Sequence, residues 1–257
     1  MNKMDPIKQL EDKFSNEFID NKSFRATELN ECIYTMESYI KIDRSVAVMS
    51  DLANNKSYIF VGAFGSYFGM MESEYTTIDS IWEEDIYQRI HPDDLFQRHL
   101  LELEFFNFLK QLPPDEQLDY CTMCHIRALN EKQEYHYITH RSLYLKNSTE
   151  GGLWLAVCLY NYSLQKSPSP NIDGKIVNLK TGQSHHVDTY KNCTDLLTSR
   201  EKEVLSEVSK GRISKEIASK LQISINTVNR HRQNILEKLK VDNSMEAVRT
   251  ADALDLL

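Results

Sequence analysis

One stretch of the sequence decides the fold of the C-terminal part, and it runs from Leu197 to Val241 as LTSREKEVLSEVSKGRISKEIASKLQISINTVNRHRQNILEKLKV. Apolar residues recur through it at spacings of three and four, which predicts amphipathic helices. Thr198 and Glu201 have the spacing of a capping box, in which each side chain binds the backbone N–H of the other. Gly211 is typical of the residue just past a helix end. The first helix is therefore expected between Thr198 and Gly211.

Three more helices are expected after Gly211. Ser214 is predicted to cap a short helix at 215–221, and Gln222-Ile223-Ser224 is predicted to be a tight turn. The third helix is expected at about 225–240, and the fourth begins at Ser244. Two helices joined by so short a turn, the second rich in hydrogen-bond donors, form the unit that docks in the major groove of DNA.

The third of these helices is expected to have two different faces. Val228, Ile235 and Leu239 form its apolar side. The opposite side carries amide and guanidinium groups suited to base edges, on Asn226, Asn229, Arg230 and Gln233. A second set is predicted to contact phosphates, which fix orientation without specifying sequence: Lys215, Thr227, His231, Arg232 and Lys238.

The motifs of this stretch resemble the LuxR-type DNA-binding domain. The matching motifs are Leu-Thr-x-Arg-Glu-x-Glu-Val-Leu from Leu197, Lys-Glu-Ile-Ala from Lys215, Thr-Val at 227–228, His231, Asn-Ile at 234–235 and Lys-Leu-x-Val from Lys238. The resemblance implies a four-helix domain that binds DNA as a dimer and reads bases through Asn229, Arg230 and Gln233. Asn229 replaces the usual lysine and Ser214 the usual asparagine, so the resemblance does not predict the operator sequence.

Charge is distributed unevenly along the chain. Residues 196–257 contain 11 Lys and Arg against 9 Asp and Glu, a net charge of +2. The whole chain has a net charge of −8, so the remainder carries −10. Acidic surfaces repel phosphate, and any contact with nucleic acid is therefore expected in the C-terminal part.

The N-terminal part combines helices with strands. Apolar spacing predicts helices at 6–20 and 26–40, and short apolar runs at 118–129, 134–146 and 152–163 predict three antiparallel strands. The aromatic run from Tyr58 to Gly69 and the His-Pro-Asp-Asp motif at 91–94 resemble a PAS domain. That resemblance implies a five-stranded antiparallel sheet with helices over one face, a pocket for a ligand, and dimerisation through the N-terminal helices.

The sequence thus predicts an α+β protein with four segments. Residues 1–44 would be N-terminal helices for dimerisation, and 45–165 a PAS-like sensory domain. Residues 166–195 would be a linker with a small hairpin, and 196–257 an all-α, four-helix helix-turn-helix domain. The cofactor is unknown, and a small-molecule ligand in the PAS-like domain is the candidate. Such a ligand would contact aromatic residues that are otherwise core, namely Tyr58, Phe60, Phe64, Tyr67, Phe68, Trp82 and Phe105.

Two patterns of cysteine and histidine are candidate cofactor sites. Cys121-x-x-Cys124-His125 matches the haem c attachment motif, but in a strand the two cysteines would lie on opposite faces. His185, His186 and Cys193 lack the spacing of paired metal ligands. No metal site is therefore predicted, and these residues are interpreted as packing and loop residues.

Several function classes find little support. Phosphate-binding glycine loops and hydrolase motifs are absent, so no enzyme is expected. A phosphoryl-accepting receiver with Asp51 as acceptor would need strands that alternate with helices. The expectation is a cytoplasmic homodimeric transcription regulator that binds double-stranded DNA, without membrane contact and with RNA polymerase as a further candidate partner. The alternatives are a regulator whose helical module binds the transcription machinery, and a sigma-factor-like protein.

Overall fold

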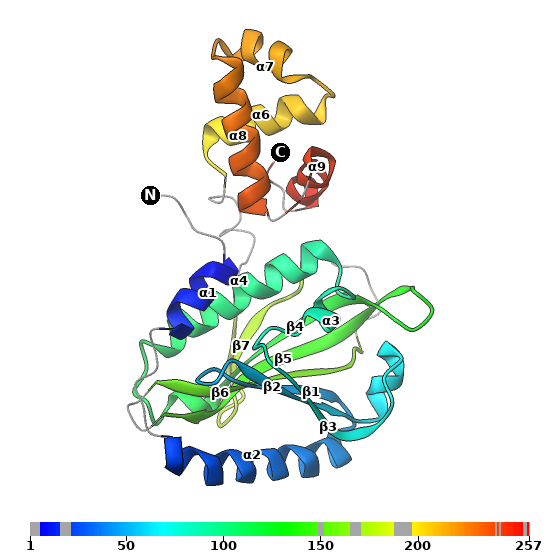
Figure 1. Cartoon of the computed structure of the whole chain (residues 1–257), viewed down its shortest axis with the longest axis vertical. Helices are drawn as coiled ribbons and strands as arrows, with labels where there is room; N and C mark the ends of the chain where they lie inside the picture. The colour runs from blue at the N-terminus through cyan, green and yellow to red at the C-terminus, as the bar shows by residue number, and fades with distance from the viewer. Residues whose placement is uncertain are drawn as a thin grey trace. The chain divides into compact units, whose positions relative to one another are not determined.

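The computed structural model describes residues 6–15, 22–148, 152–164, 171–187, 197–239, 241, 243–253 and 256. The chain divides into two units. One spans Leu10–Val187 and contains a β-sheet, and the other contains Asp188–Leu257 with the first nine residues. The α+β class is therefore confirmed, with strands in one unit and helices alone in the described part of Asp188–Leu257 (Figure 1).

The sheet unit contains eight antiparallel strands in the order β3-β2-β1-β6-β5-β4-β7-β8. The strands are β1 Val46–Asp51, β2 Lys56–Val61, β3 Ser73–Ile78, β4 Tyr120–Leu129, β5 Tyr135–Asn147, β6 Leu153–Tyr162, β7 Lys175–Asn178 and β8 Ser184–His186. The five-stranded sheet implied by the resemblance is therefore too small. The extra strands lie at the edges, where β3 pairs with β2 and β7 pairs with β4.

The expected hairpin after residue 170 is part of this sheet. β7 pairs in register with Tyr120–Met123 of β4, and β8 pairs with β7. Ile176 of β7 is buried, as is Ile172 just before the hairpin. The sheet unit therefore extends to Val187, beyond the boundary at 165 suggested by the sequence, because the hairpin covers apolar surface and satisfies an otherwise open strand edge.

Helices cover both faces of the sheet (Figure 1). α2 Lys22–Asp43 packs through Met36 and Ile40 on one face. The other face carries α1 Pro6–Ser15, α4 Pro92–Leu109, the short α3 Glu84–Tyr87, and the 3-10 helices η1 Ala63–Phe68 and η2 Gln117–Asp119. β1 is buried on both faces because Val46 and Val48 point to one core and Ala47 and Met49 to the other.

The His-Pro-Asp-Asp motif begins α4. Pro92 is the first residue of the helix, a position that needs no backbone donor. The Asp94 carboxylate accepts hydrogen bonds from the backbone N–H of Arg127 at 2.6 Å, from Nε at 3.0 Å and from Nη2 at 2.6 Å. The motif therefore ties the start of α4 to β4, a role beyond its expected effect on the helix dipole.

One alternative raised by the sequence, the phosphoryl-accepting receiver, fails on this geometry. Asp51 lies in an antiparallel strand and accepts hydrogen bonds from Trp154 and from the backbone of the turn that follows, so it belongs to no parallel receiver sheet. Cys121 and Cys124 lie on β4, and both are free thiols. Cys193 lies outside the described residues. None of the described helices has the length and apolar character needed to cross a lipid bilayer.

Candidate nucleic-acid interface

The first helix of the C-terminal unit, α6 Ser199–Ser209, begins with the predicted capping box. The backbone N–H of Glu201 donates to Thr198 Oγ1 at 3.3 Å, and that of Thr198 donates to Glu201 Oε2 at 2.8 Å. The same carboxylate oxygen lies 2.6 Å from Nζ of Lys238. Burial raises the pKa of Glu201, but hydrogen bonds from Lys238 and Thr198 outweigh it and lower this pKa.

The tight turn forms between α7 Ser214–Leu221 and α8 Ile225–Leu239. Gln222 adopts the left-handed conformation with φ of 53°, which ends α7. Ser224 then accepts the backbone N–H of Thr227 at 3.0 Å and caps α8. At the other end of α7 the cap is Ile213, whose N–H donates to Glu216, and Ser214 is the first helical residue. The expected cap at Ser214 was therefore one residue off.

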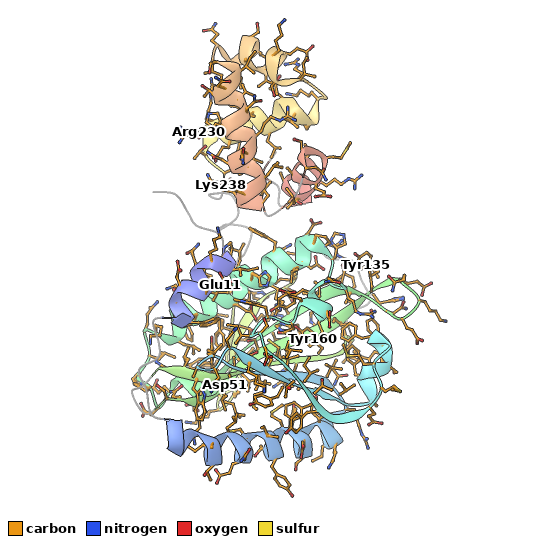
Figure 2. The ribbon with its side chains drawn as sticks, viewed as in Figure 1. Glu11, Asp51, Tyr135, Tyr160, Arg230 and Lys238 are labelled. Carbon is orange, nitrogen blue, oxygen red and sulfur yellow. The ribbon has the colours of Figure 1, made fainter. Side chains whose placement is uncertain are left out.

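The two faces of α8 are as predicted. Val228, Ile235 and Leu239 are buried against the other helices. The four residues predicted to contact bases are exposed, and their spacing of three and four places them on one stripe of the helix: Asn226, Asn229, Arg230 and Gln233. Figure 2 shows Arg230 and Lys238 on this helix. The structure thus brings the predicted base-contacting side chains together and leaves them accessible.

The residues predicted to contact phosphate have more varied positions. Lys215 is exposed in the first turn of α7. Thr227 is half-buried, and its hydroxyl is hydrogen-bonded to that of Ser224. His231 is half-buried, and its buried Nδ1 has no hydrogen-bond partner among the described residues. Lys238 is 13% exposed and paired with Glu201, so its ammonium is part of the domain interior. This position disfavours the phosphate contact that the sequence predicts at Lys238.

Arg232 connects three helices instead of standing free on the surface. Its guanidinium donates to Ser214 Oγ at 3.3 Å and to Ser244 Oγ at 2.9 Å. Ser214 begins α7, and Ser244 begins α9 Ser244–Ala253. Asn243 caps α9 by accepting the backbone N–H groups of Met245 and Glu246. Arg232 therefore holds two helix N-termini, which carry partial positive charge, beside α8.

A groove runs along α8 at this point. One part has a volume of about 740 Å³ and is lined by residues that include Asn229, Gln233 and Ser244. A second hollow of about 750 Å³ shares Asn229 and Ser244 and reaches Arg212 in the loop before α7. One continuous surface is thus lined by Asn229 and Gln233 of α8, by Ser244 at the start of α9 and by Arg212 of the loop. This arrangement suits a duplex, whose bases lie between two phosphate backbones.

A cluster of cations beside this surface was not predicted from the sequence. Glu207 is 5% exposed and pairs with Lys210 at 3.0 Å, with Lys220 at 2.9 Å and with Arg212. We call these four residues the Glu207 cluster. It has a net charge of +2 and its three cations remain partly exposed. Only the Glu207–Lys210 spacing is a local helical signal, because Lys220 joins through the packing of α7 on α6.

The comparisons with known proteins concern mainly the C-terminal unit. Residues 195–251 match the family described as bacterial regulatory proteins, luxR family. The response regulatory protein YgeK of Escherichia coli K12 is 47% identical over 55 residues, which are 21% of this chain and 37% of YgeK. The transcriptional regulatory protein DesR of Bacillus subtilis 168 is 39% identical over 92 residues, 34% of this chain and 46% of DesR. The chain spans less than half the length of these curated relatives.

A solved structure of the VqmA dimer of Vibrio cholerae aligns with 87% of this chain and 88% of its own. The identity is 15% and the TM-score 0.28. These values are too low to transfer properties from one protein to the other.

Proposed function

We propose that this chain, whose residues 195–251 form a LuxR-type helix-turn-helix domain, is a DNA-binding transcription regulator without enzymatic activity. The observation that carries the proposal is the exposed stripe of Asn226, Asn229, Arg230 and Gln233 on a helix anchored by its apolar side. Amide and guanidinium groups at this spacing are suited to adjacent base edges in a major groove.

The proposal also covers how the regulator acts in the cell. The regulator acts in the cytoplasm as a homodimer, and each copy places one α8 in the major groove. The two half-sites then lie about one helical turn of DNA apart. The sheet unit receives a signal and changes the relative placement of the two recognition helices. We also propose that the regulator contacts RNA polymerase.

The test separates base contacts from phosphate contacts. DNA selected by the purified chain from a random pool is titrated by fluorescence anisotropy at several salt concentrations. Arg230→Ala and Asn229→Ala should each reduce the preference for the selected sequence by ~1–3 kcal/mol, because each removes a base contact. Lys215→Ala should weaken selected and random duplexes alike and reduce the salt slope by about one unit.

The matched control is Lys132→Ala, which removes an exposed lysine from the sheet unit and should leave DNA binding unchanged. An affinity that does not respond to salt would contradict phosphate contact. Failure to select any duplex, with retention of RNA polymerase from the same preparation, would favour the alternative in which the helical module binds protein.

A further inference from the structure

The sheet unit contains a cavity between α4 and the inner face of the sheet. Its volume is about 40 Å³, which is room for roughly three water-sized groups. Aromatic side chains form much of its wall, namely Phe14, Trp82, Tyr87, Phe105 and Tyr144. Of the aromatic residues named as candidates from the sequence, Trp82 and Phe105 therefore line the cavity, whereas the five in β2 and η1 do not.

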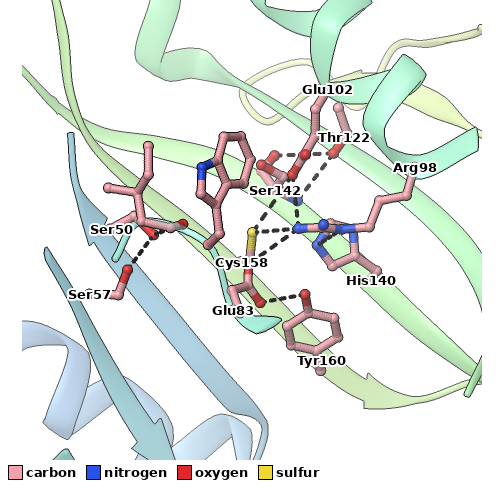
Figure 3. A network of polar contacts seen from close by, with 12 residues as sticks. Ser50, Ser57, Glu83, Arg98, Glu102, Thr122, His140, Ser142, Cys158 and Tyr160 are labelled. Carbon is pink, nitrogen blue, oxygen red and sulfur yellow. Dashed lines mark hydrogen bonds and ion pairs between the residues drawn. The ribbon is translucent and has the colours of Figure 1, made fainter. Parts of the chain in front are cut away.

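Two carboxylates, Glu83 and Glu102, also face this cavity. Both pair with Arg98, whose Nη2 lies 3.2 Å from Glu83 and 2.9 Å from Glu102. Arg98 is fully buried, and its guanidinium lies 4.8 Å from the ring centre of Tyr87. Figure 3 shows Glu83, Arg98 and Glu102 together. Tyr160 donates to Glu83 at 2.6 Å.

The positive and negative charges of this buried group do not balance. Burial lowers the pKa of His140 far below its usual value, and burial raises the pKa values of Cys158 and Tyr160, so all three are uncharged. Within the described part of the chain, Arg98 is the one Lys or Arg paired with either carboxylate. Two carboxylates therefore share a single cation.

Of the two carboxylates, Glu102 is the one better placed to meet a second cation. Its side chain is 15% exposed, whereas that of Glu83 is 2% exposed and also accepts the Tyr160 hydroxyl. Burial raises the pKa of Glu102 to about 7, against the lowering effect of Arg98. At higher pH an ionised Glu102 faces an aromatic-walled cavity, and aromatic faces attract cations.

A metal ion fits this position poorly. Donor atoms of Glu102, His140 and Cys158 lie within 4.8 Å of one another. Arg98 lies among them, however, at 3.2 Å from His140 Nε2 and 3.3 Å from Cys158 Sγ. The guanidinium thus occupies the place of a metal cation. Its Nη1 is buried and has no hydrogen-bond partner among the residues that the structure describes.

We propose that this cavity binds a small protonated amine with Glu102 as its counter-ion. The ligand has about three to four heavy atoms, because the cavity has room for roughly three water-sized groups. The ammonium would lie against the aromatic wall and supply a second cation to the two carboxylates that share Arg98. This inference deepens the proposed signal-receiving role of the sheet unit and does not depend on DNA binding.

The experiment measures thermal unfolding of the full chain at pH 8 without DNA, so its outcome is independent of the DNA-binding proposal. Ethanolamine, ethylammonium and ethanol are titrated, with sodium chloride matching the ionic strength. Ethanolamine and ethylammonium should raise the unfolding temperature in a saturable way, and ethanol should not. Glu102→Gln should weaken this response at least ten-fold.

Two variants keep the result interpretable. Glu104→Gln changes a carboxyl on the same helix outside the cavity lining and should respond like the wild type. Ala156→Val narrows the cavity while leaving Glu102 in place, and should lose the response. The proposal is overturned if both amines act no differently from sodium chloride, or if Glu102→Gln responds as strongly as the wild type.

Discussion

Two lysines of the C-terminal unit show how one residue type takes different roles. Lys215 is exposed on α7, whereas Lys238 lies 13% exposed against a glutamate that is 3% exposed. An ammonium in water is available to phosphate. An ammonium paired with a buried carboxylate is not, because removing it would leave that carboxylate without its partner.

Replacing Lys238 should therefore destabilise the protein. Lys238→Ala leaves Glu201 buried with the Thr198 hydrogen bonds alone, and we expect a loss of about 2–3 kcal/mol in the free energy of unfolding. Urea denaturation measures it. Lys215→Ala is the control and should change stability by less than about 0.5 kcal/mol. Equal stability of the two variants would contradict the assignment.

Glu102 gives the sheet unit a stability that depends on pH. Because burial raises its folded-state pKa to about 7, the folded protein binds this proton more tightly than the unfolded chain. Its contribution is complete below the unfolded pKa and is lost as pH rises through about 7. The free energy of unfolding should fall by roughly 2–3 kcal/mol between pH 5 and pH 8.

The matching variant removes this dependence. Glu102→Gln cannot ionise, so its stability should change less over the same pH range, and it should exceed the wild type at pH 8. Glu104→Gln should keep the wild-type profile. Urea denaturation at both pH values measures the difference, and a profile for Glu102→Gln that parallels the wild type would refute this account of Glu102.

At the scale of elements, the junction between α6 and α7 is held by charge. Glu207 of α6 pairs with Lys210 at the helix end, with Arg212 in the loop and with Lys220 of α7. Arg212 also lines the groove beside Asn229. The Glu207 cluster therefore both joins two elements and adds positive charge next to the proposed DNA surface.

Neutralising the carboxylate separates these two effects. Glu207→Gln should lower the unfolding temperature, because three cations lose their common partner. It should also tighten binding to random duplex DNA and steepen the salt slope by up to about one unit, because the released cations can meet phosphates. Fluorescence anisotropy across a salt series checks this result. An unchanged slope would mean that the cluster is structural alone.

At the scale of the whole molecule, the two units carry net charges of opposite sign. Residues 196–257 carry a net charge of +2 and the remainder −10. Electrostatic attraction to a polyanion therefore comes from the C-terminal unit, and it weakens as salt screens the charges. The opposite sign of the sheet unit keeps its own surface from competing for phosphate.

The sequence predicted most elements of both units but not all their boundaries. The three strands at 118–163 and the four C-terminal helices form where the apolar period placed them. The hairpin at 175–186 was predicted as part of a linker, because its pairing with β4 joins residues about 55 positions apart. Local periodicity carries no information about such a partner.

The base-directed stripe on α8 was determined by the sequence alone, because the 3.6-residue period fixes which side chains share a helix face. Only the tertiary structure decided that Lys238 pairs with Glu201, 37 residues away, and that Arg98 pairs with both Glu83 and Glu102. Charge pairing depends on distance in space and on exclusion of water, and both arise when separate elements pack together.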